Sequence, residues 1–298
     1  MLIRFLQRLL VLGIGILSVW LIVFVVFRVA DNRLPWILAF GLTYAIAAYV
    51  ILPRTVRMSL KVLQRKHVPS YTTTGDGLPG DPVNLALLGT LPQLRAAFAA
   101  MDWREADALN VASSWRMARS FLLNEPYPTA PFSTLYLFGR GQDIGFQKAI
   151  GDSPRKRHHI RFWALSLARA EDMVGTASFW LNTDRPPPGE RVLWVGAVTK
   201  DTGFSLTWLT FQFTHATDSD TNAERDFMIG ELKRHELIDE VASYRAGQHV
   251  PTERVNHYVA DGDVTLAKLV PLLAAHENGL VSGEHLRGAG SNGRGAAS

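Results

Sequence analysis

Two uncharged apolar runs open the chain. Residues 9–27 carry no charged side chain across 19 positions, and residues 34–52 repeat the pattern after a short polar connection. At 1.5 Å per residue each run would reach about 28 Å, close to the ~30 Å hydrocarbon core of a bilayer. Neither run has a polar face, which argues against two helices at the surface of a soluble core. The pattern predicts a two-span transmembrane hairpin in residues 1–53.

The positions of the cations predict the orientation of this hairpin. Arg4 and Arg8 precede the first run, and five Lys or Arg residues follow the second within residues 54–66. By the positive-inside rule, both termini are expected in the cytoplasm. Residues 54–80 are expected to form a basic juxtamembrane helix over 53–68, followed by a Gly/Pro/Thr-rich linker. That helix either lies on the membrane surface or is an ordinary solvated flank.

From residue 81 the pattern changes to short apolar stretches separated by turn residues. It predicts strands at 83–89, 133–140, 158–165, 178–182, 191–199 and 204–214, helices at 90–103, 111–123 and 222–237, and a hairpin over 254–270. "TKDTG" (199–203) reads as a tight turn, and Thr90 with Gln93 as a capping box. The fold class expected for 81–271 is α+β, a mainly antiparallel sheet with flanking helices. Residues 272–298 are expected to be a flexible tail.

The distribution of charge excludes a nucleic-acid footprint on the folded domain. The chain as a whole has a net charge of +4, but residues 1–66 carry nine Lys or Arg and one acid, whereas residues 67–298 carry 22 basic and 26 acidic residues. Nucleic-acid binding needs a basic face on the domain itself. The absence of cysteine also excludes disulfides and cysteine-based zinc sites.

Three polar clusters are candidates for chemistry. The first, "FGRGQDIGFQK" (138–148), offers Arg140 and Lys148 as anion-binding cations among glycines. Its spacing fits neither a P-loop nor a dinucleotide fingerprint. The residue types alone favour a bulged β-turn with solvated charges over an anion site.

The second cluster, "SPRKRHHIRFW" (153–163), enters a predicted strand. Alternation places His158 toward the core, and His159, Arg161 and Trp163 together on the other face. His159 is a candidate acid, base or metal ligand, and Arg161 a candidate phosphate ligand. The alternative is an exposed edge face. The preceding cations, Arg157 included, are expected in a solvated turn.

The third cluster, "THATDSDTNAERD" (214–226), joins a strand to a helix. His215, Asp218 and Asp220 are candidate catalytic residues, or ligands of a divalent metal. Thr221 and Glu224 have capping-box spacing, so Glu224 is expected to cap the helix rather than to catalyse.

Taken together, these motifs resemble the LssY C-terminal-like domain of bacteria. The resemblance is carried, in family order, by "LYLFGRGQDIGFQK", "SPRKRHHIRFW", "WVGAVTKDTGF", "THATDSDTNAERD" and "YVADG" over residues 81 to 270. The third motif departs from the family pattern, which has a second histidine and a proline where Ala216 and Ser219 stand here. Relatives are fused to DedA-type membrane domains and to phosphatidic-acid-phosphatase-like domains. The resemblance thus implies work on lipid phosphates or envelope intermediates at the bacterial inner membrane.

Three functions from different classes remain open. In an enzyme, Arg140, Arg161 and Lys148 would hold a phosphate ester, while His159 or His215 acts as base or metal ligand with Asp218 and Asp220. In a binding module, the same cations would hold a lipid headgroup without turnover. In a structural subunit, the hairpin would assemble with a membrane-protein partner. The expected partner in the first two is membrane lipid, and a divalent metal is a candidate cofactor.

Overall fold

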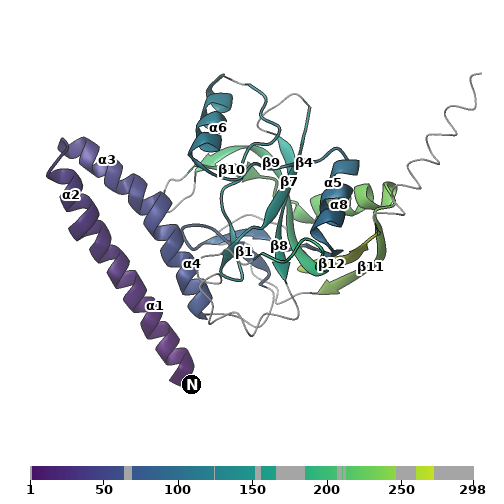
Figure 1. The fold of residues 1–298 in the computed structure, drawn as a ribbon, viewed down its shortest axis with the longest axis horizontal. Coiled ribbons are helices and arrows are strands. Elements are labelled where there is room, and N and C mark those ends of the chain that lie inside the picture. The colour runs from purple at the N-terminus through teal and green to yellow at the C-terminus, as the bar shows by residue number, and fades with distance from the viewer. Residues whose placement is uncertain are drawn as a thin grey trace, which may run out of the picture.

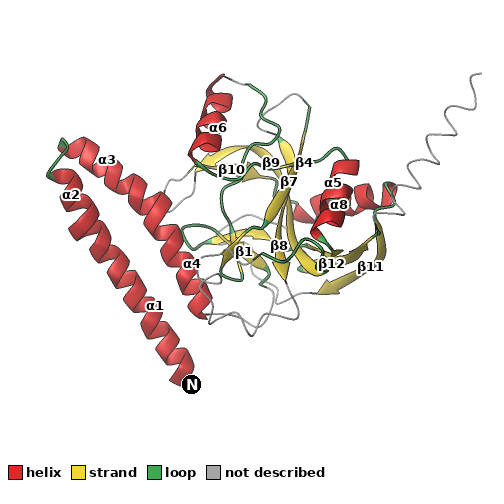
Figure 2. Ribbon diagram, viewed as in Figure 1, coloured by secondary structure: helices red, strands yellow, loops and turns green. Residues whose placement is uncertain are grey.

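Residues 2–63, 69–123, 125–151, 156–165, 185–206, 210, 213–245 and 260–271 are described by the structure, a computed structural model. Two long helices lie beside a body built of strands with shorter helices around them (Figures 1 and 2). This arrangement confirms the expected α+β class with a preceding pair of apolar helices.

The two apolar helices form a hairpin. The first consists of α1 (Leu2–Trp20), the π-helical η1 (Leu21–Phe27) and α2 (Arg28–Asp31). The second consists of α3 (Trp36–Ile46), the π-helical η2 (Ala47–Ile51) and α4 (Leu52–Leu63). Both are long and apolar enough to cross a bilayer. They are joined partly by a hydrogen bond of 2.6 Å between the hydroxyls of Ser18 and Thr55.

Helix α4 continues the second apolar helix and packs against the body with part of its cationic face. Lys61 is buried there. A side chain at Gly139 would come within 3.0 Å of the Lys61 backbone nitrogen, so the close approach depends on this glycine, whose φ is 69°. Nearer the start of the second apolar helix, in α3, the Tyr44 hydroxyl donates to the Thr210 carbonyl at 2.5 Å. The second helix therefore contacts the body at two separate levels.

The body contains two sheets. The larger has eight strands in the order β11-β12-β3-β9-β8-β7-β4, with β10 paired to β9. Its strands are β3 (Leu85–Gly89), β4 (Arg104–Glu105), β7 (Ile144–Ala149), β8 (Arg157–Leu165), β9 (Val192–Leu206), β10 (Phe213–Thr217), β11 (Ile238–Arg245) and β12 (Asp263–Leu269). All described pairings are antiparallel except β12 with β3. The smaller sheet, in the order β2-β1-β5-β6, contains β1 (Tyr71–Thr73), β2 (Pro79–Pro82), β5 (Tyr136–Leu137) and β6 (Arg140–Gly141).

Both faces of the larger sheet are covered. Helices α5 (Leu91–Ala100) and α8 (Thr221–Arg234) pack on one face around a core that includes Phe98, Phe162 and Met228. Thr90 and Gln93 form the expected capping box of α5. On the opposite face, Leu137 of the smaller sheet and the nearby Leu135 cluster with Trp163. A third helix, α6 (Val111–Leu123), has the bounds that the sequence predicted.

The turn predicted at 199–203 was wrong, because β9 continues through it to Leu206. Lys200 and Asp201 pair with His158 and Arg157 in the ladder, so these polar residues belong to the sheet. The predicted strand 204–214 is consequently divided between the end of β9 and β10.

The strand predicted at 133–140 was also wrong in its extent. Phe138 and Gly139 have φ values of 53° and 69°, and this tight turn separates β5 from β6. Near the other end of the body, β12 follows Asp261-Gly262 and pairs with β11, a strand that the pattern did not predict. The strand predicted at 178–182, residues 254–259 and the tail 272–298 lie outside the described residues.

Candidate functional site

The odd-numbered face of β8 carries a row of buried polar side chains. Arg157, His159 and Arg161 are 6%, 1% and 4% exposed, respectively. Strand β8 lies between β7 and β9 in the sheet. The alternative of an exposed edge face is therefore wrong. We call Arg157, His159 and Arg161, with their partners Asp81, Gln147, Thr199 and Asp201, the β8 cluster.

Arg157 begins the strand instead of lying in a solvated turn, so the turn prediction for this residue was wrong. Its Nε donates to Oδ2 of Asp201 at 2.8 Å, and its Nη1 donates to Oε1 of Gln147 at 2.5 Å. The amide of Gln147 donates in turn to the Ala130 carbonyl at 2.9 Å. These partners compensate the burial of a guanidinium, which is why a cation can occupy a central strand.

His159 lies at the centre of the cluster. Its Nε2 is 2.6 Å from Nη1 of Arg161 and 2.7 Å from Oγ1 of Thr199. Because a guanidinium only donates, Nε2 accepts this bond and the ring carries its proton on Nδ1. Nδ1 faces Oδ1 of Asp201 at 3.1 Å. One ring nitrogen of His159 thus lies beside a carboxylate, and the other lies beside Arg161 and Thr199.

Arg161 forms a short ion pair with Asp81 of β2. Burial by itself would raise the pKa of the Asp81 carboxyl, but the Arg161 guanidinium outweighs it and holds this pKa below its ordinary value. Asp81 also lies 3.7 Å from Nε2 of His159. The ion pair joins the smaller sheet to the larger one directly above the histidine.

The ring of Phe132 covers the cluster. Its centroid is 5.1 Å from Cζ of Arg157, 4.9 Å from Cζ of Arg161 and 5.2 Å from the His159 ring. A side chain at Gly145, opposite Arg161 in the ladder, would come within 2.8 Å of this ring. The glycine therefore makes room for Phe132, which keeps the cluster dry and places two guanidiniums against its π face.

Arg140 lies beside Trp163, in the C-terminal half of β8. Its Nη2 donates to Oδ1 of Asp143 at 2.5 Å, and Arg185 also contacts this carboxylate. Burial raises the pKa of Asp143, and the two guanidiniums lower it only in part, so that the net shift is upward. The Trp163 indole donates to the Arg140 carbonyl at 3.2 Å. Arg140 of β6 is therefore held in an ion-paired group beside β8.

Lys148 faces the side of the sheet that α5 and α8 cover. It donates to Oε2 of Glu231 at 3.0 Å and to the Met101 carbonyl at 3.2 Å. His158 lies opposite Lys148 in the ladder, with its Nδ1 2.6 Å from Oε1 of Glu224. The structure thus separates Lys148 from Arg161, although the sequence grouped them as anion ligands.

The residues of the third motif lie at the start of α8. Asp220 caps this helix, since its Oδ1 accepts from the Ala223 amide at 2.9 Å. The capping box predicted for Thr221 and Glu224 was wrong, because Glu224 turns toward His158 instead. Asp218 accepts from the Asp220 amide at 3.1 Å and lies 3.8 Å from Nζ of Lys200. Both aspartates thus have local structural partners.

The metal hypothesis concerns His215 together with these two aspartates. His215 pairs with Phe204 across the β9–β10 ladder, and its side chain lies outside the described part. Among the described residues, no group of three or more His, Asp or Glu side chains is arranged to hold a metal ion. The set of His215, Asp218 and Asp220 therefore stays a prediction.

A comparison with models of protein families identifies the family to which these motifs belong. The family model described as the LssY C-terminus matches residues 65–264. The chain belongs to this family. The LssY C-terminus match begins upstream of residue 81, where the motifs led us to set the boundary, and it includes every member of the β8 cluster. Searches of curated proteins and of solved structures returned no match.

Four members of the cluster in this LssY C-terminal chain were missed by sequence reasoning: Asp81, Gln147, Thr199 and Asp201. Thr199 and Asp201 alternate on one face of β9 directly opposite His159 and Arg157. The assumption of a turn at 199–203 hid this alternation. Asp81 lies in a Gly/Pro-rich segment with no periodicity, so no local pattern pointed to it.

Proposed function

We propose that this LssY C-terminal protein is anchored in a membrane and hydrolyses or transfers a phosphate ester at the β8 cluster. The observation that carries the proposal is the environment of His159. Asp201 faces one ring nitrogen, while the other accepts hydrogen bonds beside a guanidinium and a hydroxyl. This is the arrangement that a general base requires, with a carboxylate to stabilise the imidazolium formed when it takes a proton.

Each residue would have a definite role. Arg157 and Arg161 would exchange part of their carboxylate contacts for the oxygens of a phosphate, whose charge they stabilise bidentately. With Arg161 turned from Nε2 to the phosphate, His159 would take the proton of the attacking water or alcohol at Nε2 as its oxygen bonds to phosphorus. The ester P–O bond would break, and His159 would return this proton to the departing alkoxide. Thr199 is placed to orient Nε2. Phe132 covers all three, so its ring has to turn aside for a substrate to enter.

The two apolar helices support the membrane part of the proposal. We assign the protein to the inner membrane of a bacterium, with both termini in the cytoplasm as the flanking cations predict. A reporter fused to the C-terminus would test the orientation. Activity of a reporter that works only outside the cytoplasm would contradict it.

The catalytic proposal is tested with the full-length chain in liposomes that contain phosphatidic acid or another phosphate-ester lipid. We expect phosphate release, and a decrease of about 10²–10⁴-fold in His159→Gln. His235→Gln, which changes an exposed histidine next to α8, is the matched control. An unchanged thermal midpoint shows that the fold is intact. A stable His159→Gln protein with full activity would contradict the proposal.

A non-catalytic role is favoured by a different observation. Arg140, Lys148 and Arg161 each lie against a carboxylate of their own, namely Asp143, Glu231 and Asp81. A phosphate would have to compete with these partners, which suits reversible binding of a lipid headgroup. Salt-sensitive binding of anionic liposomes without phosphate release in the same assay would favour this second function.

A further inference from the structure

Helix α6 exposes apolar side chains along one face. Val111, Trp115 and Leu122 are 88%, 75% and 79% exposed, and Ala118 is exposed between them. These four apolar residues follow one another at spacings of four, three and four, and so form a single stripe along the helix. We call them the α6 stripe.

The buried side of α6 carries two serines with a methionine between them. Ser113 and Ser120 are both buried, and Met117 is half-buried. Ser113 exchanges hydrogen bonds with the backbone and side chain of Asn110 at 2.9 Å each, and Ser120 donates to the Glu125 carbonyl at 2.5 Å. The serines thus satisfy backbone groups at the two ends of the helix. The α6 stripe lies outside, where exposure of its apolar side chains to water is unfavourable.

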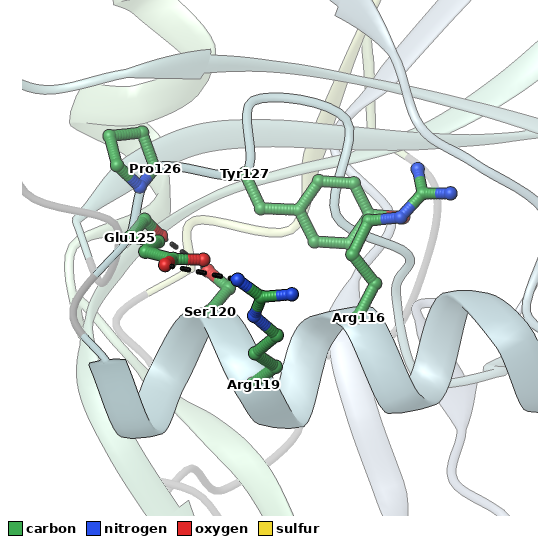
Figure 3. A pocket seen from close by; sticks show the side chains of 6 residues that line it. All are labelled: Arg116, Arg119, Ser120, Glu125, Pro126 and Tyr127. Carbon is green, nitrogen blue, oxygen red and sulfur yellow. Dashed lines mark hydrogen bonds and ion pairs between the residues drawn. The ribbon is translucent and has the colours of Figure 1, made fainter.

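Cations lie beside the stripe. Arg116 and Arg119 border a cavity of about 330 Å³ that Ser120, Glu125, Pro126 and Tyr127 complete (Figure 3). Their carboxylate partners, Asp107 and Glu125, are 3.6 and 3.5 Å away, and both guanidinium side chains are more than 60% exposed. Ion pairs this open contribute little to stability, so both cations can turn toward an anionic group at small cost.

We propose that the α6 stripe binds the surface of an anionic bilayer. Val111, Trp115 and Leu122 would enter the boundary between headgroups and acyl chains, while Arg116 and Arg119 contact lipid phosphates. An exposed tryptophan, an apolar stripe and adjacent arginines are the combination that interfacial helices use. The inference rests on the membrane anchoring proposed above, because the hairpin keeps the body near a bilayer and raises the effective concentration of its surface.

The size of the stripe favours lipid over a second copy of the chain. Thirteen residues form a helix about 20 Å long, and a strip about 10 Å wide along it covers about 200 Å². A stable protein interface needs about 800 Å² from each partner. A tethered domain needs only a weak additional contact with the membrane, which the stripe and two cations can supply.

The absence of cysteine makes a direct test simple. Trp115→Cys and Lys233→Cys are prepared in the full-length chain, labelled with an environment-sensitive fluorophore and reconstituted into liposomes containing phosphatidylglycerol. Lys233 is exposed on α8 and is the control position. We expect a blue shift at position 115 and quenching there by lipids that carry a quencher in the acyl chain. The label at 233 should show neither effect.

Two further measurements distinguish a failure of membrane anchoring from a failure of the α6 contact. Resistance of the protein to carbonate extraction reports on the hairpin alone, so a failure of anchoring is distinguished from a failure of the α6 contact. In Arg116→Gln/Arg119→Gln, or in purely zwitterionic liposomes, the shift at 115 should decrease several-fold. An anchored protein whose label at 115 behaves like that at 233 would overturn the proposal. So would a blue shift that depends on protein concentration but not on lipid charge, which would indicate a second copy.

Discussion

Asp201 lies directly opposite Arg157 in the β8–β9 ladder and accepts its Nε–H at 2.8 Å. The same carboxylate faces Nδ1 of His159 at 3.1 Å. One buried aspartate therefore fixes both the cation that begins the strand and the histidine at the centre of the candidate site. Asp201 thus connects β9 with two residues of the β8 cluster.

Replacement of Asp201 by Asn should strongly destabilise the protein. It removes the negative charge that compensates the buried Arg157, and the loss expected for one partner of a buried pair is about 3–5 kcal/mol. Urea unfolding in mild detergent measures the free energy. The control is Asp102→Asn, which alters the pair that Asp102 forms with Arg104 at a similar distance of 3.0 Å but in an exposed position. Equal losses in the two variants would show that burial is not the cause.

The two buried carboxylates near β8 should have opposite effects on the pH dependence of stability. The folded-state pKa of Asp81 is lowered. Its contribution is therefore fully present above an unfolded pKa of about 3.9 and is lost as the pH falls through the folded value. The folded-state pKa of Asp143 is raised. Its contribution is present below about pH 3.9 and is lost as the pH rises through the folded value.

Unfolding free energies between about pH 3 and pH 7 check this relation. Asp81→Asn should flatten the decrease of stability on the acid side, and Asp143→Asn should remove a decrease that occurs as the pH rises. Parallel pH profiles for the two variants would contradict the opposite pKa shifts.

Asp220 is expected to act as a helix cap. Asp220→Ala should cost about 1 kcal/mol of stability, because the Ala223 amide loses its acceptor, and Asp220→Asn should recover most of that. Thermal unfolding gives the stabilities, and the liposome assay gives the function. A stable Asp220→Asn protein that has lost its function would instead support the catalytic or metal role predicted from the sequence.

The elements that the sequence predicted well are those with local signals. Long runs without a charged residue predicted both apolar helices, and the Thr90–Gln93 capping box predicted the start of α5. Alternation correctly separated His159 and Arg161 from Ile160 and Phe162. Each of these signals comes from neighbours within a few positions of the chain, which is the range that periodicity can report.

The rest depended on contacts between distant segments. Lys200 and Asp201 look like turn residues until β8 supplies His158 and Arg157 to pair with them. Thr221 and Glu224 have the spacing of a capping box, but Glu224 contacts His158 and Asp220 caps the helix. The polar face of β8 suggested exposure because a second layer, with Phe132 and Asp81, could not be seen in the local pattern. Local propensity was overridden in each case by a tertiary ion pair.

Gly145→Ala should disturb the cluster without touching any charge. The new methyl group would come within 2.8 Å of the Phe132 ring and 3.1 Å of the Ile160 carbonyl, in a place where neither can easily move. Overpacking of this kind costs about 1–3 kcal/mol. Gly203→Ala, in the neighbouring β9, is the control, because its methyl group would meet nothing within 4 Å.

The smaller side chain in Phe132→Leu should relieve the clash, so Gly145→Ala/Phe132→Leu should be more stable than the sum of the two single changes predicts. Strict additivity in urea unfolding would show that the ring does not rest on Gly145. Coupling between the two sites would instead show that the Phe132 ring packs directly on Gly145, where only a glycine leaves room for it above the guanidiniums. Any ligand of His159 must then first displace this ring.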